Sequence, residues 1–136
     1  MKFLKSIVCI LFLGLIAACS GSAGNSPEGA AKAFVEKSYA GDADAVIAMV
    51  DIPDELKSEA GVEEMLTGKV KAGVAQEKRK AEELGGIDKI TVLKFEPLPN
   101  NDSKGTVTIE TTFKGGRTVE DRVKVIRTEN GWKISL

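Results

Sequence analysis

Histidine is absent from the 136-residue sequence, and this absence removes more chemistry than any other feature of the composition. Imidazole is the commonest general base near neutral pH, the usual activator of serine and cysteine nucleophiles, and the commonest ligand of transition metals. The sequence therefore gives no support to a histidine-dependent hydrolase or a zinc-type centre. We expect neither a metal nor any other cofactor.

The sequence has only two cysteines, and none of its apolar runs is long enough to cross a membrane as a helix. Cys9 lies inside an apolar stretch over residues 7–18, and Cys19 follows it directly. As a helix the stretch would span only about 18 Å, less than the roughly 30 Å of a bilayer core. Its length, after a basic start with Lys2 and Lys5, favours a signal peptide over a transmembrane anchor.

The end of the apolar stretch has a more specific pattern. Residues 15–19, Leu-Ile-Ala-Ala-Cys, resemble the lipobox of lipoprotein signal peptidase, in which small side chains precede a cysteine that becomes lipidated and N-terminal. An ordinary cleavage site with a coincidental cysteine is the alternative. We predict a signal peptide over residues 1–18, lipidation of Cys19, and a flexible tether that completes residues 19–25. More than one acyl chain would hold the protein stably on a membrane.

Ser20 and the net charge bear on location and partners. Lipoprotein sorting in Gram-negative cells usually retains proteins with Asp after the lipidated cysteine at the inner membrane, so Ser20 implies delivery to the outer membrane. Loss of Lys2 and Lys5 with the signal changes the formal charge from −1 to −3, which gives no reason to expect a nucleic-acid partner. We expect a lipid-anchored envelope protein that faces the periplasm or the cell surface. The sequence does not determine its oligomeric state.

Residues 26–136 suffice for a single domain and not for two. Ser26 predicts the N-cap of a first helix, Gly41 its end, and Asp42 the cap of a second short helix. Helical spacing continues over residues 54–84, although three glycines weaken the expectation of one unbroken rod. The mixed charges near its end predict a solvated face. Its residues expected to face inward are Leu56, Val62, Leu66, Val70, Val74 and Leu84.

The hydrophobic period changes from helix to strand after Gly86. Four strands are expected, around residues 90–95, 106–113, 119–125 and 132–136, with a loop at 97–102. Their inward residues include Val107, Ile109, Val123, Val125 and Ile134. The pair Asn130-Gly131 predicts a two-residue hairpin that places Val125 opposite Leu136. Around Gly115-Gly116, only a loop of three or five residues with a glycine at positive φ brings the apolar faces to one side. Helices followed by an antiparallel sheet indicate the α+β class.

Two parts of the chain resemble nuclear-transport-factor-2-like (cystatin-like) domains. The sequences SPEGAAKAF at 26–34 and YAGDADA at 39–45 resemble their first helices, and DRVKVIRTENGWKI at 121–134 resembles their final hairpin. In particular, the chain is similar to small bacterial lipoproteins whose domain of this fold has no known function. The resemblance implies N-terminal helices packed on a curved antiparallel sheet, with a conical pocket at one end. It indicates a fold rather than an activity.

Tyr39, Asp121 and Trp132 are the candidates for lining that pocket. Some proteins of the implied fold, such as ketosteroid isomerase, use a carboxylate base with a tyrosine and a protonated acid as oxyanion donors. Asp121 falls on the apolar face of its strand and could pair with Tyr39, but no second pocket carboxylate can be assigned. Plainer alternatives exist: Asp121 at a bulge facing solvent or opposite Thr111, Tyr39 with its hydroxyl in water, and Trp132 in the core.

Two functions of different class remain, besides a purely structural role. The first is a non-catalytic binding or interaction module in the envelope, whose ligand is an unknown small molecule or an envelope protein. The second is a small-molecule enzyme of isomerase or lyase type that uses Asp121, as a pocket carboxylate, together with Tyr39. The missing histidines and the structural nature of the resemblance favour the first.

Overall fold

The computed structural model describes residues 25–135, and the predicted signal peptide, Cys19, most of the tether and Leu136 lie outside this range. The elements follow in the order α2 (Pro27–Ala40), α3 (Ala43–Met49), β1 (Val50–Asp51), α4 (Asp54–Lys57), α5 (Val62–Glu83), β2 (Ile87–Leu98), β3 (Asn101–Phe113), β4 (Thr118–Thr128) and β5 (Gly131–Ser135). Between residues 25 and 135, no helix is both long and apolar enough to cross a bilayer.

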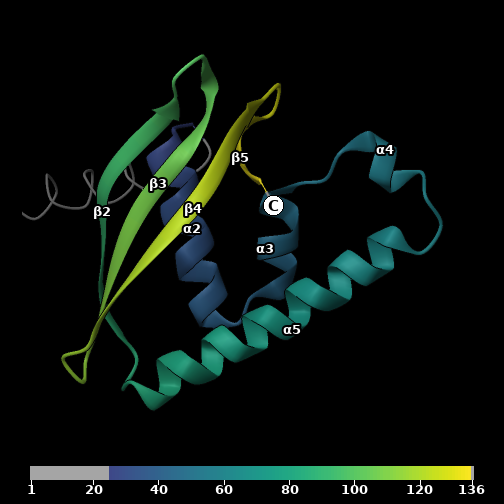
Figure 1. The fold of residues 1–136 in the computed structure, drawn as a ribbon. Coiled ribbons are helices and arrows are strands. Elements are labelled where there is room, and N and C mark those ends of the chain that lie inside the picture. Colours follow the sequence, from purple (N-terminus) through teal and green to yellow (C-terminus); the bar gives the residue numbers. More distant parts are fainter. Residues whose placement is uncertain (1–24, 136) are drawn as a thin grey trace, which may run out of the picture.

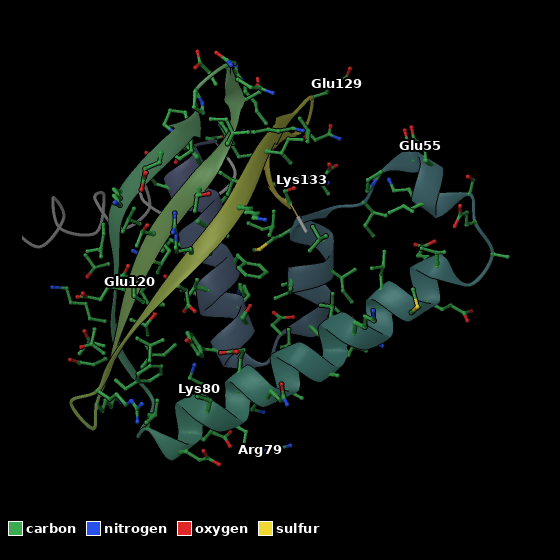
Figure 2. All side chains as sticks on the ribbon, viewed as in Figure 1. Glu55, Arg79, Lys80, Glu120, Glu129 and Lys133 are labelled. Atoms are coloured by element: carbon green, nitrogen blue, oxygen red, sulfur yellow. The ribbon has the colours of Figure 1, made fainter. Side chains whose placement is uncertain are left out.

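The helices gather on one face of the sheet (Figure 1). Helix α2 lies against the sheet, α3 lies beside α2, and α5 runs across the ends of both. Helix α4 packs against the beginning of α5, at a distance from the sheet. Glu120 on β4 is exposed and lies on the opposite face of the sheet (Figure 2). The apolar core therefore forms between one face of the sheet and the helices.

The helix ends form where the local sequence predicts them. The Ser26 side chain accepts a hydrogen bond from the backbone N–H of Gly29, and the Asp42 side chain accepts one from Ala45 N–H. Gly41 ends α2 with φ of +80°, a conformation that glycine adopts without steric cost. These caps confirm the predicted first and second helices, and they fix the sharp turn that brings α3 against α2.

The predicted helix over residues 54–84 is two helices, because Gly61, at φ of +83°, separates α4 from α5. Helix α5 then continues without a break through Gly68 and Gly73. Leu56, expected to face inward, is 38 % exposed, because α4 packs against α5 at a distance from the sheet. Val74 is buried, and the remaining expected inward residues are partly buried.

The sheet contains five strands in the order β1-β5-β4-β3-β2, not the four that the sequence predicts. The additional strand, β1, has only two residues, and Val50 and Asp51 pair in parallel with Ile134 and Ser135 of β5. Strands β2 and β3 also extend into the predicted loop at 97–102, leaving a tight turn between Leu98 and Asn101. The sequence did not predict β1, because a strand of two residues is too short to show a hydrophobic period.

The loop between β3 and β4 has three residues, one of the two lengths that the sequence predicts. Phe113 N–H donates to the Arg117 carbonyl at 2.8 Å, and Gly116 within the loop has φ of +93°. Thr111 then lies opposite Val119, so both strands present their apolar residues to the helices. The five predicted inward residues, Val107, Ile109, Val123, Val125 and Ile134, are all buried.

The last hairpin differs from its predicted register by two residues. Val125 pairs with Ile134 rather than Leu136, and Thr128 pairs with Gly131. The Thr128 hydroxyl closes the turn, because it donates to the Gly131 carbonyl at 2.8 Å and accepts from Asn130 N–H at 3.2 Å. A shift of two keeps every side chain on its expected face, since the pleat has a period of two.

Candidate functional site

A cavity of about 310 Å³ lies where α2, α3 and α5 meet strand β4. Its walls are mostly apolar, and its polar groups come from α2, α5 and β4. The lining residues are Phe34, Val35, Ser38, Tyr39, Val46, Val50, Val70, Gly73, Val74, Gln76, Glu77, Asp121 and Arg122. The volume is at the lower end of the range of about 300–1,000 Å³ typical of small-molecule sites.

Helical spacing explains why the cavity walls are apolar. Val35 and Tyr39 are four residues apart on α2, and Val70 and Val74 are four apart on α5, so each pair lies on one helix face. The wall on α5 is interrupted at Gly73, where an added Cβ would meet no atom within 4 Å. The helix backbone thus leaves open space at this point of the wall.

Tyr39 and Asp121 meet at the polar end of the cavity. The Tyr39 hydroxyl donates a hydrogen bond to Asp121 Oδ2 at 3.1 Å, although the two residues are 82 positions apart in the chain. The Tyr39 ring is 4 % exposed and packs edge-on against Phe113, with ring centroids 5.3 Å apart. The alternative that placed the Tyr39 hydroxyl in water is therefore wrong.

Asp121 is held by a regular part of the sheet. It lies opposite Ile109, and the β3–β4 pairing has no irregularity there, so the alternatives of a bulge and of a position opposite Thr111 are wrong. Its side chain is half-buried on the helix-covered face. The adjacent Arg122 is exposed, and its charge contributes to lowering the pKa of Glu96 on β2, although Lys94 beside Glu96 is the main cause.

Glu77 on α5 is the cavity residue that sequence reasoning missed. It belongs to the mixed-charge stretch expected to be a solvated helix face, yet it is half-buried and lines the cavity beside Tyr39. Its position three residues after Val74 is the one signal for it, because i and i+3 share a helix face. Arg79 in the same stretch projects away from the domain, as expected (Figure 2).

The acidic surroundings of Tyr39 change its ionisation. Burial raises the pKa of the hydroxyl well above its ordinary value, and the negative charges of Asp121 and Glu77 raise it further. The hydrogen bond to Asp121 acts in the same direction, because an acceptor favours the protonated phenol. At neutral pH the tyrosine is therefore a neutral donor.

Tyr39 is the sole tyrosine of the chain, so its titration can be followed directly by near-ultraviolet absorbance. An unfolded tyrosine ionises near pH 10, and the folded pKa is higher. The stabilisation linked to this group is therefore complete below about pH 10 and is lost as pH rises above it toward the folded pKa. We expect Tyr39→Phe to remove this part of the alkaline loss of stability. Ionisation of the folded protein near pH 10 would contradict the buried hydrogen bond.

Trp132 does not belong to this cavity. It lines a second cavity of about 190 Å³ between the first turns of α2, the end of α3 and strand β5, with Ala30 and Met49 among its neighbours. The indole is partly buried against the core and packs edge-on on Phe95, with ring centroids 5.8 Å apart. The structure thus brings together two of the three candidate residues and places the third elsewhere.

The polar residues that line the first cavity are Ser38, Tyr39, Gln76, Glu77, Asp121 and Arg122, so it offers two carboxylates, one phenol, one hydroxyl, one amide and one guanidinium-bearing residue. No lysine lines it among residues 25–135, so Ser38 has no amine base of the Ser-Lys type beside it. Within the same range, no three side chains of the metal-binding types gather. The arrangement can accept hydrogen bonds and bind positive charge next to an apolar surface.

Comparison with known proteins identifies the fold. Residues 20–135 match the family described as "Domain of unknown function (DUF4878)". A solved structure, "Putative NTF2-like transpeptidase" from Campylobacter jejuni, is similar with a TM-score of 0.71 and 21 % sequence identity, covering 82 % of this chain and 98 % of that one. No curated protein sequence matches the chain. The chain belongs to the DUF4878 family of domains of unknown function, and its fold is that of the nuclear-transport-factor-2-like proteins.

Proposed function

We propose that this protein is a lipid-anchored envelope lipoprotein whose domain binds a small molecule without catalysis, in the cavity between α2, α5 and β4. The observation that carries the proposal is the cavity itself, with apolar walls and a single polar end where Tyr39, Asp121 and Glu77 converge. Apolar lining with a few converging polar groups is typical of ligand sites.

The proposed anchor rests on the N-terminal sequence. The basic start, the short apolar stretch and the lipobox-like pattern ending at Cys19 together support export and lipidation. The short distance in sequence between Cys19 and Pro27, where α2 begins, would keep the cavity near the membrane surface. In a Gram-negative cell, Ser20 supports the outer membrane as the destination.

The hydrogen bond between Tyr39 and Asp121 supports binding over catalysis. In the isomerase arrangement the tyrosine donates its proton to the reacting oxygen, but here Tyr39 donates to Asp121. The candidate donor, Tyr39, and the candidate base, Asp121, thus form a hydrogen bond with each other rather than with a substrate. The name of the Campylobacter jejuni protein includes a transpeptidase activity, but the identity of 21 % supports a shared fold alone. Acyl transfer would also require an activated nucleophile.

Two glycines of α5 allow the cavity to be closed without disturbing the core. An added Cβ at Gly73 or at Gly68 would meet no atom within 4 Å, but Gly73 lines this cavity and Gly68 does not. Each glycine lies inside a helix, so leucine at either position should raise the free energy of unfolding by up to about 1 kcal/mol. Gly68→Leu is therefore a matched control for Gly73→Leu.

The proposal predicts that the full-length protein, purified from membranes, retains a small molecule that Gly73→Leu loses. Native mass spectrometry would compare the bound mass in the wild type, Gly73→Leu and Gly68→Leu. The wild type and Gly68→Leu should hold the same ligand, and Gly73→Leu should hold less than about a tenth as much, since a side chain would occupy the ligand's space. A wild type without ligand, or equal retention in both variants, would contradict a binding function for this cavity.

A further inference from the structure

We propose that the ligand of this cavity is a small organic cation, with an apolar body against the valine walls and a single ammonium group between Asp121 and Glu77. This inference rests on the proposed binding function and names the chemical class of its ligand. It combines three features of the cavity: its apolar walls, its two carboxylates and the direction of the Tyr39 hydrogen bond.

Among residues 25–135, no positively charged side chain forms an ion pair with the two carboxylates at the polar end. Ion pairs among residues 25–135 join Lys57 to Asp54 and Lys94 to Glu96, both on the surface. Neither Asp121 nor Glu77 is in an ion pair, although both are half-buried beside apolar side chains. An opposite charge close to a carboxylate favours its ionised form. A cationic ligand would supply that charge.

Among residues 25–135, Arg122 is the one positively charged residue that lines the cavity. It is exposed, makes no ion pair with Asp121 or Glu77, and acts electrostatically on Glu96 of the neighbouring strand β2. As the residue next to Asp121 in a regular strand, it belongs to the opposite face of the sheet. Its charge is therefore directed to the outer face and leaves the acidic end available.

The hydrogen-bonding groups at this end match an ammonium group in number and kind. An ammonium group has three N–H donors and no acceptor. Asp121 and Glu77 each accept through carboxylate oxygens, and Tyr39 can also accept, because its own proton is directed to Asp121. These three acceptors, on α2, α5 and β4, line the same cavity. A neutral alcohol would satisfy fewer of them, and a carboxylate ligand would meet repulsion from both acids.

The apolar walls determine the rest of the ligand. Valines at positions 35, 46, 50, 70 and 74, together with Phe34, provide a surface with few hydrogen-bonding groups. A bare ammonium ion or methylamine would leave this surface wet and would gain little from the hydrophobic effect. A compact hydrocarbon ring with an aminomethyl group fills both parts of the site.

Four probes test this assignment on the full-length lipidated protein in nanodiscs of zwitterionic lipid: cyclohexylmethylamine, cyclohexylmethanol, cyclohexanecarboxylate and methylamine. Affinities would be measured at neutral pH by ligand-observed NMR. We expect cyclohexylmethylamine to bind at least about tenfold more tightly than the alcohol, because charge-assisted hydrogen bonds are the stronger ones. The carboxylate and methylamine should bind more weakly still. Equal affinity for the amine and the alcohol, or a preference for the carboxylate, would overturn the assignment.

Substitution of Asp121 and Glu77 tests whether these two carboxylates cause the preference for the amine over the alcohol. The double variant Asp121→Asn/Glu77→Gln keeps the shape of the site, so cyclohexylmethylamine should bind at least about tenfold more weakly while the alcohol changes by less than about twofold. Trp132, the sole tryptophan of the chain, lies outside this cavity. Its fluorescence would therefore verify that the variant is folded. An unchanged preference for the amine in the double variant would overturn the role of these carboxylates.

The Gly73→Leu and Gly68→Leu variants show whether a negative result rules out only the cationic ligand or also the proposed binding function. Gly73→Leu should abolish binding of cyclohexylmethylamine, and Gly68→Leu should leave it unchanged. If Gly73→Leu loses the molecule that co-purifies with the protein but the amine is not preferred, the ligand class is wrong and the binding function stands. If Gly73→Leu affects neither the co-purifying molecule nor the probes, both proposals fail.

Discussion

Replacing Phe113 by alanine should lower the free energy of unfolding by about 3–5 kcal/mol, the range for loss of a buried aromatic side chain. Phe113 is 1 % exposed and lies at the end of β3. It packs against the Tyr39 ring, and its backbone N–H closes the loop to β4. Truncation leaves a void between the sheet and α2 that these rigid neighbours can fill only in part.

Denaturant unfolding followed by Trp132 fluorescence would measure this effect, since the indole lies in the separate second cavity. Phe113→Leu is the matched control, because it retains most of the apolar volume and should cost clearly less than the alanine variant. The Tyr39 titration of the alanine variant should also move toward the ordinary value, as its ring loses its edge-on partner and becomes more hydrated. A cost below about 1 kcal/mol for Phe113→Ala would contradict the packing described.

Replacing Cys19 by alanine should abolish lipid incorporation and leave an uncleaved precursor, because lipoprotein signal peptidase acts on the modified cysteine. The protein would then lose the acyl chains proposed to hold it on the membrane. Metabolic labelling with a palmitate analogue, together with the apparent mass of the product, would measure both effects. Labelled Cys19→Ala protein, or a mature-sized product without lipid, would contradict the proposed anchor.

Cys9→Ala is the control for this experiment. Cys9 is the other cysteine of the chain and lies within the apolar stretch proposed to be removed. Its replacement retains the apolar length that the export machinery requires, so lipid labelling and processing should match the wild type. Loss of lipid labelling in Cys9→Ala would contradict the assignment of the lipid to Cys19.

Local sequence was sufficient where the interactions themselves are local. The caps at Ser26 and Asp42 and the glycine end of α2 join residues at most four positions apart, so their residue types alone predict them. The alternation of apolar residues likewise predicted which side of β3 and β4 faces the core. It also excluded a two-residue loop between them, which would have put the apolar faces on opposite sides, and allowed the three-residue loop that the structure has.

The same alternation could not determine everything about the sheet. A pattern with a period of two is unchanged by a shift of two residues, so it could not detect that Val125 pairs with Ile134. In the observed register, the Thr128 side chain closes the last turn. Strand β1 could not be predicted either, because its two residues become a strand only by pairing with β5, more than eighty positions later.

The candidate site shows the same division. The sequence determined that any chemistry must do without histidine, and the parity of β4 placed Asp121 on its apolar face. Only the tertiary structure decided that Tyr39 donates to Asp121, that Glu77 joins them, and that Trp132 lies in another cavity. The reason is physical: these contacts join α2, α5 and β4, and the distances between elements are set by packing of the whole core, which no local pattern encodes.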